Sequence, residues 1–246
     1  MKTDLKILTV DLETGLNIVA DFSCGYNKVI THKQIIKERA IICAAWKWLG
    51  KSKVYSKHWG LTKQDDTQLL VELQKAMSKA DFVITQNGDK FDLRWLQARA
   101  LMLGLKPFPK VTSLDTLKMN RKAFNLNSYK LDYVASILGL GHKSPMEFQD
   151  WVDIVVHKSA KALDKMIKYN KKDVLLTEKV FLKVLPYTNL AAPLFAYKAK
   201  ESVVCETCGE NDTLIKNGYR YTKTGRKQIY FCEPCNRHTT SRFLEK

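Results

Sequence analysis

Apolar positions along the first half of the chain follow two periods, and each period predicts a different kind of element. Short runs rich in apolar and β-branched residues predict strands over residues 7–14, 40–49, 52–59 and 81–87. The first of these runs reads "ILTVDLET", and its continuous apolar stretch is typical of a strand covered on both faces of a sheet.

Two helices are expected between and after these strands. Residues 65–80 carry apolar side chains three and four positions apart, which is helical spacing, and Asp65 or Asp66 is placed to cap the first turn. Residues 91–104 follow the fourth strand and end at Gly104, a residue that commonly closes a helix.

The second half of the chain changes character twice. Residues 128–186 read as mostly helical, and the stretch "PYTNLAAP" then breaks the pattern. Strands followed by alternating strand and helix, and then helices, predict an α/β or α+β layered fold. The small, cysteine-bearing region after about residue 200 predicts a second unit, so the expected domains are residues 1–198 and 199–246.

The first strand is unusual because it ends in two carboxylates. Asp11 and Glu13 are two residues apart, so strand geometry directs both side chains to the same side of the sheet. Asp92 follows the fourth strand in "NGDKFD", and Asp173 lies four residues after Tyr169 in "YNKKD", on the same face of a helix. Four gathered carboxylates repel one another, and hard divalent cations such as Mg²⁺ or Mn²⁺ remove that conflict.

Each of these patterns also has an ordinary structural explanation. An acidic pair at a strand end occurs often by chance, and "NGDKFD" is compatible with a simple turn into a helix, with Asn87 and Gly88 in left-handed geometry. The combination of three spaced patterns, each on a plausible element, is what favours a two-metal site for phosphodiester chemistry.

The three patterns resemble the motifs of the DEDD exonuclease superfamily, the DnaQ-like branch of the ribonuclease H-like fold. "DLET", then Asn87-Phe91-Asp92 as "NxxxFD", then Tyr169-Asp173 as "YxxxD", are similar to the DEDDy subtype found in family B DNA polymerase proofreading domains and RNase D-like enzymes. The DEDDh subtype has a histidine five residues before its last aspartate, where this chain has Lys168. The resemblance covers about residues 5–188 and implies an α/β fold, a ribonuclease H-like mixed sheet flanked by helices.

The resemblance implies a role for each matching residue. Asp11 bridges two Mg²⁺ or Mn²⁺ ions, Glu13 and Asp173 complete the site of the ion that holds the attacking water, and Asp92 holds the second ion. Tyr169 orients that water, because a phenol with a pKa near 10 is a poor base at neutral pH. Asn87 and Phe91 contact the terminal nucleotides.

Two residues near these motifs have structural alternatives. Packing in the core is an alternative role for Phe91, whereas Asp115, in "SLDTLKM", is expected to start a helix or turn.

Charge points to a polyanionic partner. The formal net charge is +16, and nucleic acid is the simplest partner for such a chain. Beside the expected site, a basic stretch interleaved with aromatic residues suits phosphate contacts and base stacking, and its candidate substrate-binding residues are Lys118, Arg121 and Lys122. No apolar run approaches the roughly 18 residues of a membrane span, and no secretory signal is recognised, so a cytoplasmic, non-secreted protein is expected.

Four of the six cysteines form two CxxC pairs in the last fifth of the chain. Cys205, Cys208, Cys232 and Cys235 have the spacing at which four thiolates surround one structural Zn²⁺, with a redox dithiol as the weaker alternative. Cys24 and Cys43 are isolated and are expected to be reduced, buried thiols.

Between the two cysteine pairs, the sequence predicts a β-hairpin with the tip "KTGRK". The whole unit resembles zinc ribbons appended to transposases and other nucleic-acid enzymes. Its candidate nucleic-acid contacts are Lys216, Arg220, Arg226 and Lys227. The alternative is a zinc-stabilised appendage that docks on the main domain or on another protein.

Taken together, these patterns predict a two-metal 3′→5′ exonuclease that acts on single-stranded 3′ ends and releases nucleoside 5′-monophosphates. DNA is the preferred substrate, since the motifs resemble the polymerase-proofreading pattern and no RNase D-like helical domain is recognised. The alternatives are an RNA-trimming nuclease and a nucleic-acid-binding or partner-recruiting module with a vestigial site. A separate polymerase or a replication or repair factor is the candidate protein partner.

Overall fold

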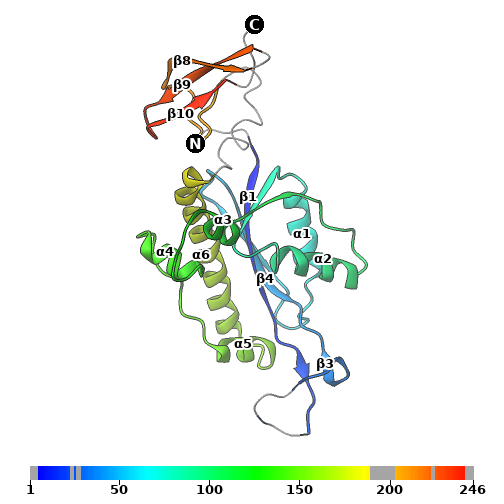
Figure 1. Cartoon of the computed structure of the whole chain (residues 1–246). Helices are drawn as coiled ribbons and strands as arrows, with labels where there is room; N and C mark the ends of the chain where they lie inside the picture. Colours follow the sequence, from blue (N-terminus) through cyan, green and yellow to red (C-terminus); the bar gives the residue numbers. More distant parts are fainter. Residues whose placement is uncertain (1–4, 23–24, 26–28, 189–202, 223–224, 242–246) are drawn as a thin grey trace.

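The computed structural model describes residues 5–22, 25, 29–188, 203–222 and 225–241 (Figure 1). Its main unit is a five-stranded sheet in the order β5-β4-β1-β6-β7. The strands are β1 (Ile7–Thr14), β4 (Ile41–Trp48), β5 (Val54–His58), β6 (Phe82–Thr85) and β7 (Thr112–Asp115). β1 runs antiparallel to β4 and parallel to β6, which is itself parallel to β7, so the mixed sheet predicted from the sequence is confirmed.

Helices cover both faces of this sheet. They are α1 (Thr67–Met77), α2 (Asp92–Met102), α3 (Thr116–Ala123), α4 (Leu131–Ile137), α5 (Phe148–Val155) and α6 (Ala160–Val184). Two 3₁₀ turns, η1 (His32–Gln34) and η2 (Leu185–Tyr187), and a small pair of strands, β2 (Ile18–Val19) with β3 (Ile35–Lys37), complete the described part of this unit.

Alternation along β1 explains the two layers of core. Leu8, Val10 and Leu12 face α1 and α2 in one buried cluster. Ile7 faces the opposite side, where it packs with α3, α4 and α6. Because Asp11 and Glu13 share the parity of Ile7, they lie on the α6 side, and this places them opposite the third acidic motif.

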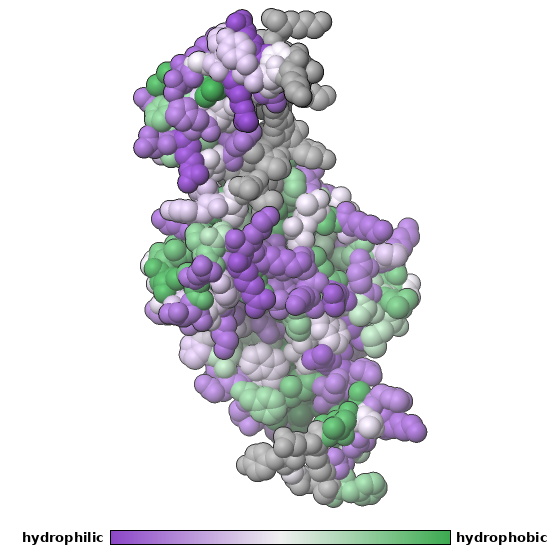
Figure 2. Space-filling model, viewed as in Figure 1, coloured by the Kyte–Doolittle hydropathy of each residue, from purple (hydrophilic) through white to green (hydrophobic). Residues whose placement is uncertain are grey.

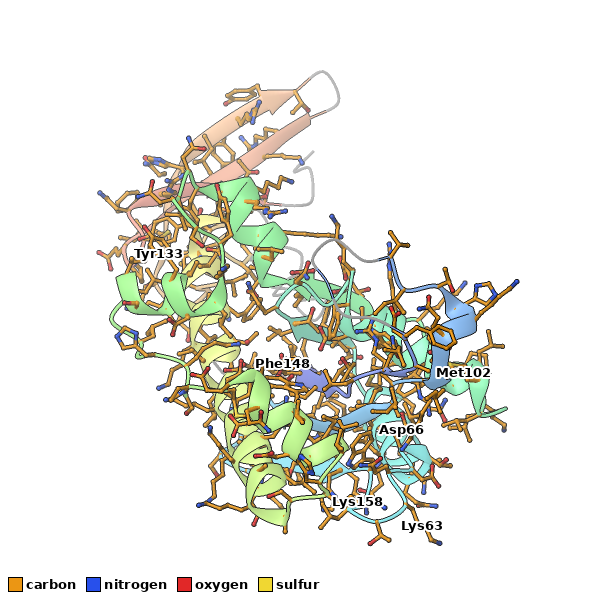
Figure 3. The ribbon with its side chains drawn as sticks, turned by 90° about the horizontal axis from the view of Figure 1, so that it is seen from below. Lys63, Asp66, Met102, Tyr133, Phe148 and Lys158 are labelled. Atoms are coloured by element: carbon orange, nitrogen blue, oxygen red, sulfur yellow. The ribbon has the colours of Figure 1, made fainter. Side chains whose placement is uncertain are left out.

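Buried ion pairs join the helices to the sheet. Arg99 of α2 binds both carboxylate oxygens of Asp66 over 2.7 and 2.8 Å, and Asp66 also accepts the backbone N–H of Ile41. Lys47 of β4 and Glu178 of α6 form a second pair at 2.5 Å. Figure 3 shows Asp66 and Met102 on one side of the sheet and Phe148 and Tyr133 on the other.

The sequence located most of these elements to within a few residues, but it missed others. β7 and the β2–β3 pair were not predicted. α5 falls within the region read as mostly helical but was not singled out, and of α3 only its possible start at Asp115 was expected. β7 is only four residues long and half polar, so it lacks the apolar run that identifies a strand. Asp66 occupies the N-cap position of α1, but its carboxylate is engaged with Arg99 and does not cap the helix. Asp65 Oδ1 accepts the Thr67 N–H instead, over 2.9 Å.

The cysteine-rich region forms a separate three-stranded sheet in the order β10-β9-β8. Its strands are β8 (Leu214–Thr222), β9 (Gly225–Cys232) and β10 (Arg237–Thr240), and β8 with β9 makes the predicted hairpin. The expected domain boundary at residue 198 and Cys24 both lie outside the described residues. None of the helices in the described ranges is long and apolar enough to cross a membrane.

Candidate active site

Carboxylates from the first strand and the last helix meet at one place. Asp11 and Glu13 of β1 and Asp173 of α6 each offer an oxygen within 4.8 Å of the others. Asp173 is buried, whereas the other two keep some exposed surface. The structure therefore brings together three of the four predicted acidic residues, from positions more than 150 residues apart in the chain.

The fourth carboxylate, Asp92, lies beside this cluster rather than within it. It is the first residue of α2 and is 3% exposed, and its Oδ1 accepts the backbone N–H of Leu12 over 3.1 Å. Pairing between β1 and β6 ends before Leu12, so the Asp92 side chain bonds an amide that no β6 carbonyl reaches. Its negative charge helps to raise the pKa of Asp11.

The loop that precedes Asp92 depends on the residue types at positions 87 and 88. Asn87 adopts a left-handed φ of 64°, which this residue type tolerates, and its N–H donates to Asp115 Oδ1 over 2.9 Å. Gly88 is required for space rather than for φ, because a Cβ there would lie 2.3 Å from Thr85 Oγ1. Asp115 caps α3 by accepting the Leu117 N–H, so its expected helix-start role is confirmed.

Two residues that the sequence analysis missed contact the acidic cluster. Lys143, in the connection between α4 and α5, places its Nζ 2.5 Å from Asp173 Oδ2 and 2.7 Å from the Tyr169 hydroxyl. Asn170 is fully buried on α6, and its Nδ2 donates to Asp11 Oδ2 over 2.6 Å. Asn170 could have been found from the sequence, because it is a polar residue on the apolar face of a helix. Lys143 lies in an irregular segment, where no periodic pattern indicates the position of its side chain.

Crowding gives the carboxylates abnormal proton affinities. Burial and then repulsion from Asp173 raise the pKa of Glu13 to about 8, and burial raises the pKa of Asp92 to about 7. Burial also raises the pKa of Asp173 and of Asp11, the latter well above its usual value. Burial alone lowers the pKa of Lys143, but the neighbouring Asp173 carboxylate reverses that effect and raises it, so its ammonium stays charged.

The donor set fits divalent cations. All the acidic ligands offer hard oxygen atoms, which Mg²⁺ and Mn²⁺ prefer. Asp173 Oδ1 is buried and has no hydrogen-bond partner, so one ligand atom is unused. Burial first, and then repulsion between the carboxylates, raises the pKa values of Asp11 and Glu13, and a bound cation would favour their charged forms.

The predicted substrate-binding residues fall into two groups. Around the acidic site, Phe91 is partly exposed and packs against the core and Trp95. Lys118 forms an ion pair with Asp89. Arg121 lies 5.6 Å from the ring centre of Tyr129, and Lys122 is exposed. Figure 2 shows hydrophilic side chains gathered on the face that carries α3.

The second group lies in the cysteine-rich region, whose described residues 203–222 and 225–241 include the sheet of β8, β9 and β10 and are called the ribbon from here on. Lys216 and Arg220 are exposed on β8, and Lys227 lies opposite Arg220 on β9. The guanidinium of Arg226 lies 4.2 Å from the ring centre of Tyr219, an arrangement that leaves an aromatic surface beside a cation.

The four ribbon cysteines converge. Sγ atoms of Cys205 and Cys235, and of Cys208 and Cys232, are 3.5 Å apart, and all four lie within 4.8 Å of one another. These distances are too long for disulfide bonds and close to the ~3.8 Å edge of a tetrahedron with Zn–S bonds of about 2.3 Å. His238 lies outside this cluster and contacts Asn217 over 2.7 Å.

Comparisons with known proteins agree with this fold. A model of the RNase H superfamily matches residues 36–185, a stretch that contains Asp92, Tyr169 and Asp173 but not β1. No curated protein matches the chain. Among solved structures, the chain is similar to the family B DNA polymerase from the hyperthermophilic archaeon Pyrobaculum calidifontis, with a TM-score of 0.50 and 12% identity. The match covers 90% of this chain and 31% of the polymerase chain, and at this identity it shows the fold alone.

Proposed function

The chain belongs to the RNase H superfamily, and from that premise we propose that it is a two-metal-ion 3′→5′ exonuclease. The proposed substrate is the single-stranded 3′ end of DNA, and the products are nucleoside 5′-monophosphates. One observation carries the proposal: carboxylates of Asp11, Glu13 and Asp173 converge from β1 and α6 within 4.8 Å. Similarity in fold to a DNA polymerase supports a nucleic-acid substrate.

In this proposal the acidic residues hold two Mg²⁺ or Mn²⁺ ions. Asp11, Glu13 and Asp173 would supply ligand oxygens from the cluster, and Asp92 would supply one from beside it. When bound, such ions activate a water and stabilise the leaving oxygen of a phosphodiester. Asn170 fixes the orientation of Asp11 through its hydrogen bond to Oδ2, and Asp92 fixes the start of α2 against β1.

Tyr169 and Lys143 act on the nucleophile and the phosphate. Burial raises the pKa of Tyr169 to about 12, so its hydroxyl keeps its proton at neutral pH and orients water instead of deprotonating it. Lys143 donates to that hydroxyl and thereby directs the Tyr169 O–H away from itself. Its ammonium also supplies a positive charge where negative charge develops on the reacting phosphate.

The ribbon is proposed to hold one structural Zn²⁺ through its four cysteines and to help bind the nucleic acid. Tyr219 and Arg226 on one face provide a stacking surface with a neighbouring cation. Lys216, Arg220 and Lys227 add phosphate contacts. The division into an exonuclease domain over residues 1–198 and a ribbon domain over 199–246 is part of this proposal, and so is a separate polymerase or repair factor as protein partner.

The test uses single strands labelled at the 3′ or the 5′ end, as DNA and as RNA, with Mg²⁺ or Mn²⁺. The proposal predicts release of labelled mononucleotide from 3′-labelled DNA and a descending ladder from 5′-labelled DNA. Asp11→Asn should abolish cleavage and keep binding, whereas Asp164→Asn, an exposed carboxylate on the same α6, should leave both unchanged. Cleavage of RNA alone would establish the RNA-trimming alternative, and binding without cleavage under either metal would establish the binding module.

A further inference from the structure

A cavity of about 250 Å³ lies beside the edge strand β7, separate from the acidic cluster. We call it the edge-strand cavity, and its principal lining residues are Asp89, Leu114, Lys118, Met119, Lys122 and Tyr187. An apolar cavity of about 150 Å³ is enough to hold benzene. The edge-strand cavity is therefore large enough for one aromatic base, but it lies below the roughly 300 Å³ of most small-molecule pockets.

The lining combines the two chemistries that a nucleotide requires. Leu114 and Met119 are buried and apolar, and the ring of Tyr187 is held edge-on by Phe124 at 5.5 Å. Lys118 and Lys122 lie four residues apart on α3, so they share one face of that helix and reach solvent at the rim. An aromatic base suits the apolar part of the cavity, and a phosphate suits the rim.

Charge at the rim favours an anion. The Asp89 carboxylate is already paired with Lys118, which lowers the pKa of Asp89. Asp115, the second carboxylate of the lining, is buried and accepts the backbone N–H groups of Asn87, Asp89 and Leu117. In the described part of the chain no acidic side chain pairs with Lys122, so its ammonium is the charge left at the exposed rim. A phosphate monoester or diester would balance it.

The edge strand adds polar groups that can orient a base. β7 is the last strand of the sheet, so alternate backbone N–H and C=O groups point away from β6. Ser113, Leu114 and Asp115 line the cavity along that edge. An apolar cavity with a few convergent polar groups is typical of a specific ligand site.

The position of the cavity relates it to the acidic site. β1, β6 and β7 are parallel, and two strand spacings, about 10 Å, separate β1 from β7. Asp115, at the carboxyl end of β7, accepts backbone N–H groups of both Asn87 and Asp89, so the loop before Asp92 forms one wall. The cavity and the acidic cluster thus share the carboxyl edge of the parallel strands, where α/β proteins bind ligands.

We propose that the edge-strand cavity binds one nucleotide, with its base against Leu114, Met119 and Tyr187 and its phosphate at Lys118 and Lys122. The nucleotide is either an internal residue of the strand whose 3′ end lies at Asp11, or a free mononucleotide product. The choice between these two sources rests on the proposed exonuclease function, whereas occupancy of the cavity by a nucleotide does not.

Calorimetric titration with 5′-dAMP in EDTA tests occupancy without any catalysis. Lys122→Gln should weaken binding about tenfold or more, since it removes a charge-assisted phosphate contact. Lys75→Gln is the matched control, because it removes another exposed lysine from the last turn of a helix, α1, and it should bind like the wild type. Ala123→Phe fills the cavity without changing charge and should abolish binding. Tyr187→Ala removes the exposed ring that would contact the base, and it should weaken binding.

Two further arms identify the source of the nucleotide. If the cavity holds a strand residue, Ala123→Phe raises KM for intact DNA but not for DNA with an abasic residue at one position near the 3′ end. If it holds product, Ala123→Phe leaves KM unchanged and removes inhibition by added 5′-dAMP. Failure of 5′-dAMP to bind, or binding that Lys122→Gln, Ala123→Phe and Tyr187→Ala all leave unchanged, would overturn the inference. Cleavage of labelled DNA would still stand in that case.

Discussion

The ammonium of Lys143 lies 2.5 Å from Oδ2 of Asp173, one of the carboxylates that are proposed to bind metal. In the metal-free protein this one cation offsets part of the repulsion among Asp11, Glu13 and Asp173. It also joins the connection between α4 and α5 to the middle of α6. Removal of its charge should therefore be felt both in stability and in metal binding.

Lys143→Met should lower the free energy of unfolding in EDTA by about 1–3 kcal/mol, because it leaves a buried carboxylate without its cation. Addition of Mg²⁺ should recover more stability in this variant than in the wild type. Denaturant unfolding with and without Mg²⁺ measures both quantities. Lys168→Met, at an exposed position on α6, is the control; equal Mg²⁺ stabilisation of all three proteins would contradict the prediction.

Stability of the metal-free protein should fall as pH rises from about 5 to about 8. Burial and repulsion raise the pKa of Glu13 from 4.5 to about 8, so the folded state holds a proton in this interval that the unfolded state has lost. Where the folded state binds more protons, stability decreases with increasing pH. Thermal unfolding in EDTA across this interval measures the slope, which Glu13→Gln should reduce. A slope that is unchanged in Glu13→Gln would refute the assignment to this residue.

Metal affinity should rise over the same interval, because protons and cations compete for the same carboxylate oxygens. The Asp92 carboxyl, with a pKa raised to about 7, contributes to this dependence. Titration with Mn²⁺ followed by paramagnetic relaxation at several pH values checks it. An affinity that is independent of pH would show that the carboxylates are ionised throughout.

Gly88→Ala should displace the loop that leads to Asp92. A Cβ at this position would lie 2.3 Å from Thr85 Oγ1, and overpacking of this kind costs about 1–3 kcal/mol. We expect lower stability and a larger proportional loss of nuclease activity. Gly104→Ala is the control, since its Cβ would meet nothing within 4 Å and only its φ of 65° is unfavourable. Full activity in Gly88→Ala would mean that the loop position is unimportant.

Arg99→Met should strongly lower the free energy of unfolding, because it removes the partner of the buried Asp66 carboxylate. Asp66 is fully buried, and loss of its partner leaves an uncompensated charge that costs about 3–5 kcal/mol. For a unit of this size the melting temperature should fall by about 6–20 °C. Arg94→Met, at an exposed position of the same α2, should change it little. A small shift for Arg99→Met would indicate that Asp66 is solvated or protonated when unpaired.

Cys208→Ser should remove zinc from the purified protein. Four thiolates complete a tetrahedral shell, and a ribbon of this size has too little core to fold without the metal. Elemental analysis should give one zinc per chain for the wild type and for Cys43→Ala, and little for Cys208→Ser. Cys43 is buried in β4, away from the ribbon. Retained zinc in Cys208→Ser would place the metal elsewhere.

How much could be predicted from the sequence depended on whether a feature is local. The parity of Asp11 and Glu13 on one strand, and of Tyr169 and Asp173 on one helix, follows from backbone geometry alone. Lys143 lies in an irregular segment, so no period places its side chain, and only the tertiary structure brings it to Asp173. The edge-strand cavity could not be predicted for the same reason, since residues of β7, of α3 and Tyr187 line it from three separate segments.

The acidic cluster joins the first strand of the domain to its last long helix, and the Asn170–Asp11 hydrogen bond spans 159 residues of sequence. A ribosome must therefore release nearly the whole domain before Asp11 can meet its partners. Half-synthesised chains carry Asp11 and Glu13 without Asp173, so they lack the assembled site. On the proposed function, the chain therefore acquires its activity only after the whole domain has been synthesised and folded.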